Sequence, residues 1–249
     1  MLWVGTSFKM NKTVAEVETY CRQLLAENLP NNIQIFIAPP FTALYAAGKQ
    51  LEDSNILLAA QNMHGQDAGA FTGEISAAML KDCGCGAVVL GHSERRRDYN
   101  ETDETVAQKV TQALKYDLRP IVCMGELQQS GPEEALPFIK KQAESIVRAA
   151  AGHDPSRIVF SYVPVWSVGE KGAAASSSHA VTVIRQLKEY LQNTHRFAPT
   201  VLYGGSVTLD NCTDYLHSSR TDGVFVGRAG LDPLNFISIV KKVQSFRLG

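Results

Sequence analysis

Long apolar segments are missing from this chain of 249 residues, although 45% of its residues are hydrophobic. No apolar run approaches the roughly 18 residues that a membrane-spanning helix needs. The chain also lacks an excess of positive or negative charge, because 24 Lys and Arg nearly balance 25 Asp and Glu, for a net charge of −1. The sequence therefore predicts neither a nucleic-acid nor a membrane partner. The opening MLWVGTSFKMNK lacks the pattern of a signal peptide, so we expect a cytoplasmic protein.

Cysteine is scarce and has no metal-binding or redox pattern. Of the five cysteines, Cys83 and Cys85 are separated by one residue rather than two, and the others are scattered. In a reducing compartment such residues are small buried hydrophobic side chains. We therefore expect free thiols inside the fold.

Short β-branched segments alternate with longer amphipathic ones, and no proline- or glycine-rich linker divides the chain. Apolar runs such as IQIFIA (33–38) and RPIVCM (119–124) are typical of parallel strands buried on both faces. The predicted strands are 2–8, 33–38, 56–61, 86–91, 118–123, 157–164, 199–204 and 221–226. The amphipathic segments, predicted as helices, are 13–29, 101–117, 133–151, 178–194 and 232–245.

This alternation predicts the fold class. Eight strand–helix units in about 250 residues fit a closed (β/α)8 barrel, and we predict a single α/β domain of this kind over residues 1–249. An open doubly wound sheet is the alternative. That fold usually has a glycine-rich phosphate loop after its first strand, and GTSFKMNK is not one.

Polar residues and glycines follow several predicted strands, which is where such barrels place their reacting groups. Lys9 follows the first strand, and His92 follows the fourth in GHSERRR (91–97). The segments YGGSV (203–207) and VGRAG (226–230) follow the seventh and eighth. Glycines between a strand and a helix let backbone N–H groups approach an anion closely. The sequence thus predicts a phosphate site and, beside it, a pocket for a small anionic substrate.

These segments belong to a set of motifs that resembles the triosephosphate isomerase family over essentially the whole chain. The motifs occur in the family's order and at nearly the family's spacing, and together they are highly specific. They are KMN (9–11), AAQN (59–62), GAFTGEIS (69–76), VVLGHSERR (88–96), CMGE (123–126), PVW (164–166), YGGSV (203–207) and GVFVGRA (223–229).

The resemblance implies an aldose–ketose isomerase that acts on a small phosphorylated sugar without a metal ion or an organic cofactor. It implies that the Lys9 ammonium faces the charge of the substrate. It also implies that neutral His92 polarises the carbonyl group, a role for which triosephosphate isomerase is the type case.

The remaining implied features concern the phosphate, a loop and a partner. A loop near 167–173 is implied to close over the substrate, as in triosephosphate isomerase itself. The GAFTGE loop implies a homodimer through residues 69–76, with Thr72 near the neighbouring subunit's site. The phosphate is implied to bind the backbone at Gly169, Ser206, Gly227 and Arg228.

Two departures from the family lie at the rim of the implied pocket. Ser7 stands where triosephosphate isomerases carry asparagine, which shortens one hydrogen-bonding group beside the substrate oxygens. Arg228 replaces a glycine of the phosphate loop and adds a charge. Both features, with GEKG (169–172), resemble the related branch of L-erythrulose-1-phosphate (tetrulose-phosphate) isomerases. A sugar one carbon longer than a triose needs altered contacts at such positions.

The third departure removes a functional group. In SYVPVWSVG (161–169), Val163 occupies the position of the family's catalytic glutamate, and a hydrocarbon cannot accept a proton. A positioned general base contributes roughly 10²–10⁴ in rate.

Three interpretations of Val163 stay open. The chain is an isomerase that has lost its base by substitution, or a non-catalytic sugar-phosphate-binding or structural homologue, or an enzyme whose base has moved. Glu170 is the nearest carboxylate in the sequence for the third interpretation, with Glu94 and Glu126 as weaker alternatives.

Overall fold

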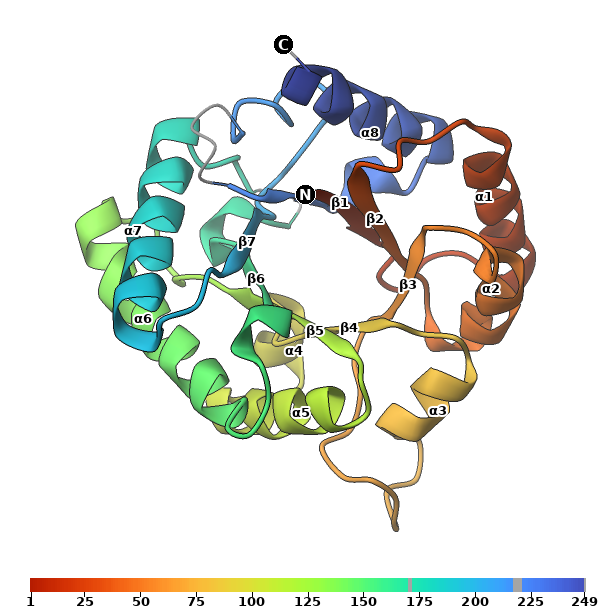
Figure 1. The fold of residues 1–249 in the computed structure, drawn as a ribbon, viewed down its shortest axis with the longest axis horizontal. Helices are drawn as coiled ribbons and strands as arrows, with labels where there is room; N and C mark the ends of the chain where they lie inside the picture. The colour runs from red at the N-terminus through yellow and green to blue at the C-terminus, as the bar shows by residue number, and fades with distance from the viewer. Residues whose placement is uncertain (170–171, 217–220, 249) are drawn as a thin grey trace.

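The structure is a computed structural model, and it describes residues 1–169, 172–216 and 221–248. Its parallel strands pair in chain order and close into a barrel, with the helices in a ring outside (Figure 1). The predicted barrel is therefore confirmed, and the open sheet is excluded. The strands are β1 (Leu2–Ser7), β2 (Ile33–Ala38), β3 (Leu57–Ala60), β4 (Ala87–Leu90), β5 (Arg119–Met124), β6 (Val159–Tyr162), β7 (Thr200–Tyr203) and β8 (Gly223–Val226).

The helices match the predicted amphipathic segments to within a few residues, and three shorter ones join them. The shorter ones, which follow β2, β3 and β4, were not delimited from the sequence because one or two turns show too little of the 3.6-residue period. The helices are α1 (Val14–Ala26), α2 (Leu44–Leu51), α3 (Ala77–Asp82), α4 (Ser93–Asp98), α5 (Asp103–Lys115), α6 (Pro132–Ala149), α7 (Ser177–His195) and α8 (Pro233–Leu248). Short 3-10 turns are η1 (Phe41–Ala43), η2 (Pro155–Arg157), η3 (Val165–Ser167) and η4 (Arg228–Gly230).

Local signals determine where several helices begin. Before α1, the Glu16 carboxylate accepts a hydrogen bond of 2.7 Å from the Thr13 backbone N–H, which is half of a capping box. Helix α6 begins at Pro132, a position where the missing N–H has no intrahelical partner in any case. Before α7, the Ser176 hydroxyl accepts from the His179 N–H at 3.2 Å. These starts follow from short-range chemistry.

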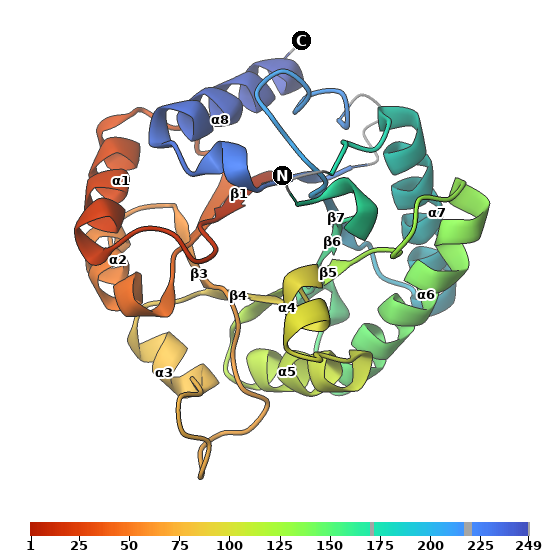
Figure 2. The ribbon, with the colours of Figure 1, turned by 180° about the vertical axis from the view of Figure 1, so that it is seen from behind.

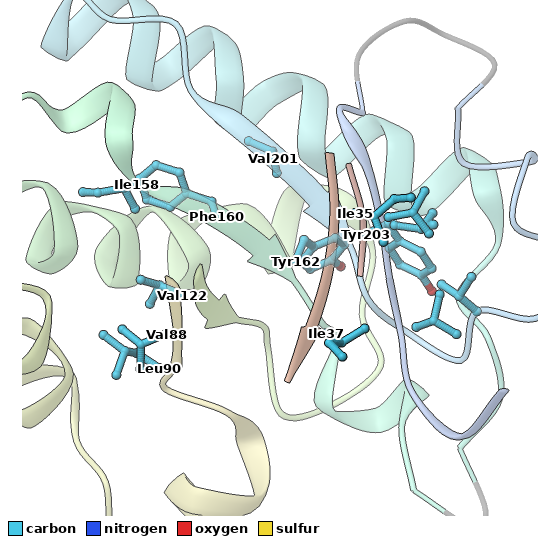
Figure 3. Packing of buried hydrophobic residues seen from close by; sticks show 14 of the residues in the cluster. Ile35, Ile37, Val88, Leu90, Val122, Ile158, Phe160, Tyr162, Val201 and Tyr203 are labelled. Atoms are coloured by element: carbon cyan, nitrogen blue, oxygen red, sulfur yellow. The ribbon is translucent and has the colours of Figure 1, made fainter. Parts of the chain in front are cut away.

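Strand residues alternate between the barrel interior and the layer under the helices. On β6, Phe160 and Tyr162 belong to the large cluster that packs against the helices, whereas Val159 belongs to a smaller cluster inside the barrel. Figure 3 shows Phe160, Tyr162 and Tyr203 among the residues of the outer cluster. Val163, two positions after Ser161, continues the inward series and belongs to the interior cluster.

The cysteines behave as predicted. All five are free, and four of them are buried. Burial raises the pKa of the Cys85 and Cys123 thiols to about 12, so both stay protonated and unreactive near neutral pH. In the described part of the chain, no helix combines the length and the apolar character needed to cross a membrane.

Gly125 is required where β5 ends beside β6. A Cβ at this position would overlap the backbone carbonyl of Val163, and the Val163 N–H donates to Met124 O at 2.7 Å just beside it. We therefore expect Gly125→Ala to lower the free energy of unfolding by about 1–3 kcal/mol, the usual effect of overpacking. Urea titration measures this change.

The matched control is Gly131→Ala, because a Cβ on Gly131 meets nothing within 4 Å. Gly131 is the N-cap of α6, where alanine is less favourable than glycine, so we expect this variant to lose less than about 1 kcal/mol. Equal unfolding midpoints for the two variants would contradict the proposed overlap.

Candidate active site

The predicted site residues come together around one cavity of about 810 Å³. They lie at the last residue of β1 or in the loops after β1, β4, β6, β7 and β8, so they share the carboxyl end of the barrel. The cavity is lined by all of them: Ser7, Lys9, His92, Val163, Gly169, Ser206, Gly227 and Arg228. Their chemical roles stay predictions. Glu94, Val168, Phe225 and Leu231 also line it.

Lys9 is held in an unusual backbone conformation. Its φ is +51°, in the left-handed region that non-glycine residues rarely adopt. The Gln61 side-chain amide donates to Lys9 O at 3.0 Å and to Ala38 O at 2.8 Å. The Lys9 N–H itself donates to the Ser7 hydroxyl at 3.3 Å. Strain that is supported by tertiary contacts in this way is typical of functional positions.

The Lys9 ammonium lies 2.6 Å from Glu94 Oε1. Burial disfavours the charged form of Glu94, but the hydrogen bond from Lys9 and the nearby positive charges outweigh burial and lower its pKa. Glu94 is therefore an ionised carboxylate that belongs to the cavity, rather than a group remote from it. In the described chain, no group of three His, Cys, Asp or Glu side chains is arranged to hold a metal ion.

His92 caps the short helix α4. Its Nδ1 accepts a hydrogen bond of 3.2 Å from the Glu94 backbone N–H, so a neutral ring carries its proton on Nε2. Burial, reinforced by Lys9 and opposed by Glu94, lowers the pKa of His92 to about 4. Near neutral pH the ring is thus uncharged and has one N–H to donate, which suits an electrophile that polarises a carbonyl group.

Val163 presents a hydrocarbon to the same cavity. Its side chain is only 5% exposed, and a Cβ on Gly204 would lie 2.8 Å from its Cγ2. The preceding residue, Tyr162, faces the helix layer, and its hydroxyl donates to Glu126 Oε1 at 3.1 Å. Glu126 therefore lies on the other side of the strand and does not line the cavity. Glu170, the other carboxylate considered as a base, lies outside the described residues.

The loops after β7 and β8 give the cavity the features of an anion site. Ser206 has a φ of +49°, and its hydroxyl donates to Ser167 O at 2.5 Å, which ties the β7 loop to the β6 loop. Gly227 precedes η4, and no atom lies within 4 Å of where its Cβ would be. Arg228 is exposed at the rim of the cavity. Lys9 and Arg228 outnumber Glu94 among the charged lining residues that the structure describes, which favours an anionic ligand.

A comparison with known protein families matches residues 2–243 to the family described as Triosephosphate isomerase. The chain belongs to the triosephosphate isomerase family. This membership agrees with the closed barrel and with the order of the motifs along the chain.

Relatives within this family carry a more specific name. The chain is 39% identical to the L-erythrulose-1-phosphate isomerase of Rhizobium etli over 98% of this chain and 93% of that protein. It is 40% identical to the enzyme of the same name from Rhizobium meliloti, over 97% of this chain and 96% of the relative. The Mesorhizobium japonicum protein of that name is 39% identical, over 98% and 97%. The predicted resemblance to the tetrulose-phosphate branch is confirmed at the level of sequence.

The low pKa of His92 predicts a pH dependence of stability. As the pH falls from its ordinary pKa of 6.5 towards about 4, unfolded His92 takes up a proton and folded His92 does not. The unfolded state then binds more protons, so stability falls over this window, by about 3 kcal/mol in total. We expect the His92 ring signals in NMR to titrate near pH 4.

His92→Asn is the control, because an asparagine Oδ1 still accepts from the Glu94 N–H. Urea unfolding of this variant at pH 7 and pH 4 should show a smaller loss of stability than the parent. A parent His92 signal that titrates near pH 6.5 would rule out the neutral-histidine interpretation.

Proposed function

We propose that this chain is a sugar-phosphate isomerase scaffold in which Val163 leaves the proton-transfer step without its base. The observation that carries the proposal is the single cavity that Lys9, His92 and Val163 share with the glycine loops after β7 and β8. Binding groups and a carbonyl-polarising group are present. At the position of the family's base, Val163 offers no acceptor for the proton.

The proposed ligand is a small phosphorylated ketose. The phosphate would lie at the backbone of Gly169, Ser206 and Gly227 with the Arg228 guanidinium beside it, because glycines at a strand end let backbone N–H groups approach an anion. Support for a four-carbon sugar comes from Ser7 and Arg228, the two departures from the triosephosphate pattern, and from the names of the three relatives. The proposed substrate is therefore a tetrulose phosphate, with a triose phosphate as the second possibility.

The proposed reaction moves one proton between adjacent carbons through an enediolate. A base takes the proton from the carbon next to the carbonyl group, and the carbonyl oxygen gains negative charge. The His92 Nε2–H and the Lys9 ammonium stabilise that charge. The proton of the adjacent hydroxyl group passes to the former carbonyl oxygen, and the base returns its proton to the former carbonyl carbon. No net oxidation occurs. With Val163 at the base position, the carboxylate among the described lining residues is that of Glu94, which is paired with Lys9.

A non-catalytic sugar-phosphate-binding role is the second candidate. The packing of Val163 favours it, since this side chain is buried in the interior cluster beside Phe225 and Leu202. A valine suits the end of a barrel strand on packing grounds alone. Binding without turnover needs only the anion site and the donors, which this chain retains.

Restoring a carboxylate tests the proposal. We expect Val163→Glu to raise kcat by roughly 10²–10⁴ over the parent, the usual contribution of a positioned base. Both chains would be assayed on dihydroxyacetone phosphate and on a tetrulose 1-phosphate, and the better substrate identifies the branch. Val163→Gln is the matched control, because it has nearly the same shape as glutamate but is not a base.

Two results would change the proposal. A parent chain as active as Val163→Glu would show that the base lies elsewhere, and Glu170→Gln would then be the next variant. If neither chain turns over either sugar although both bind it, the non-catalytic candidate is correct.

We also propose that the chain forms a homodimer through residues 69–76. This loop extends away from the ring of helices (Figures 1 and 2), and Phe71 in it is 44% exposed. The Phe71 ring packs on His64, with the centroids 4.1 Å apart. An exposed aromatic side chain on a protruding loop is suited to insertion into a second copy.

Sedimentation velocity at micromolar concentration is expected to show a dimer. Phe71→Arg should weaken it at least tenfold, roughly the effect of losing 1.4 kcal/mol of binding energy. Leu234→Arg is the matched control, because Leu234 is 59% exposed on α8, away from the loop. A monomeric parent would contradict the proposed dimer.

A further inference from the structure

Four side chains meet on the outer face of β6, which packs against the helices and does not face the cavity. Tyr162 comes from β6, Glu126 from the β5–α6 loop, Trp166 from η3 and His179 from α7. The Tyr162 hydroxyl and the Trp166 Nε1–H both donate to Glu126 Oε1, at 3.1 and 2.8 Å. His179 Nε2 lies 2.9 Å from the same Tyr162 hydroxyl. The four groups form one connected hydrogen-bond network.

The direction of the hydrogen bonds follows from the number of protons. Burial and the Glu126 carboxylate raise the pKa of Tyr162 far above its ordinary value, so the phenol keeps its single proton. The hydroxyl donates that proton to Glu126 Oε1, so the Tyr162 oxygen can only accept from His179. His179 must therefore donate its Nε2–H to the Tyr162 oxygen. His179 is thus the outermost donor of the network.

Glu126 depends on these donors. Its carboxylate is buried, and Oε2 has no hydrogen-bond partner in the described chain. The imidazole of His179 lies near this carboxylate, with Nε2 3.8 Å from Oε1. A buried carboxylate is costly unless its oxygens are hydrogen-bonded, so each lost donor destabilises its position. The loop backbone before it is held separately, by the Gln142 side chain accepting from the Gly125 N–H at 3.1 Å.

The network connects both ends of the segment between β6 and α7. Trp166 lies at the start of this segment, and His179 lies in the first turn of the helix that follows it. Between them, Val168 and Gly169 line the cavity. The network thus contacts the chain on both sides of Val168 and Gly169.

We propose that His179 is a positioning residue that holds Trp166 through Tyr162 and Glu126, and so places Val168 and Gly169 at the cavity. His179 touches neither the cavity nor the reacting atoms. The effect on Trp166 is independent of the proposed function, whereas the effect on phosphate binding rests on it.

The indole N–H signal of Trp166 in NMR reports directly on its bond to Glu126. The chain has two tryptophans, so a Trp3→Phe variant assigns the two indole signals and Trp3 serves as an internal reference. In His179→Leu we expect the Trp166 indole N–H to exchange with solvent at least tenfold faster. Inorganic phosphate should bind at least fivefold more weakly by calorimetry. His179→Gln, whose amide N–H can replace Nε2–H, should stay within twofold of the parent in both measurements.

The matched control lies on the same helix. His195→Leu removes a histidine that lies 2.6 Å from Glu144 at the other end of α7, and it should change neither quantity. If His179→Leu does not fold, Tyr162→Phe removes the same link and should give the same tenfold increase in exchange.

The outcomes separate the two proposals. Unchanged indole exchange in His179→Leu, or an equal loss in His179→Gln, overturns the positioning role. A parent that does not bind phosphate overturns the proposed anion site, and the indole exchange still decides the role of His179.

Discussion

The alternation of inward and outward side chains in a closed parallel barrel governs the rest of this structure. On β6 it sends Tyr162 to the helix layer and Val163 to the cavity, although the two residues are neighbours. A shift of one residue in register would exchange them. Two neighbouring residues therefore face different surroundings, because Tyr162 hydrogen-bonds to Glu126 under the helices while Val163 lines the cavity with Lys9 and His92.

Within the cavity, the arrangement separates binding from proton transfer. The Lys9 ammonium is paired with Glu94, and burial keeps His92 neutral with one N–H to donate. The glycine loops after β7 and β8 line the same cavity. In the proposed function, the valine at 163 leaves these groups, which suit an anion and a carbonyl oxygen, without the family's base. Stabilising the transition state needs a base as well as the groups that bind the ligand, whereas ligand binding needs only the latter groups.

Most of the fold could be predicted from short-range patterns. Apolar runs located the strands, and amphipathic segments located α1, α5, α6, α7 and α8. The helices α3 and α4 were too short to show a period. The site residues were predicted from motifs, yet Glu94 was set aside, because nothing near it in the chain shows that Lys9, 85 residues away, lies 2.6 Å from its carboxylate.

The strand–helix alternation, the glycines after β7 and β8 and the hydrocarbon side chain at 163 follow from the sequence. These are properties of residue type and local spacing. Only the folded barrel shows that Glu94 faces Lys9, that burial lowers the pKa of His92 and that Glu126 lies behind β6 with His179. Each of these depends on distances and burial that exist only when the barrel closes, since closure brings the ends of strands far apart in the chain to one rim.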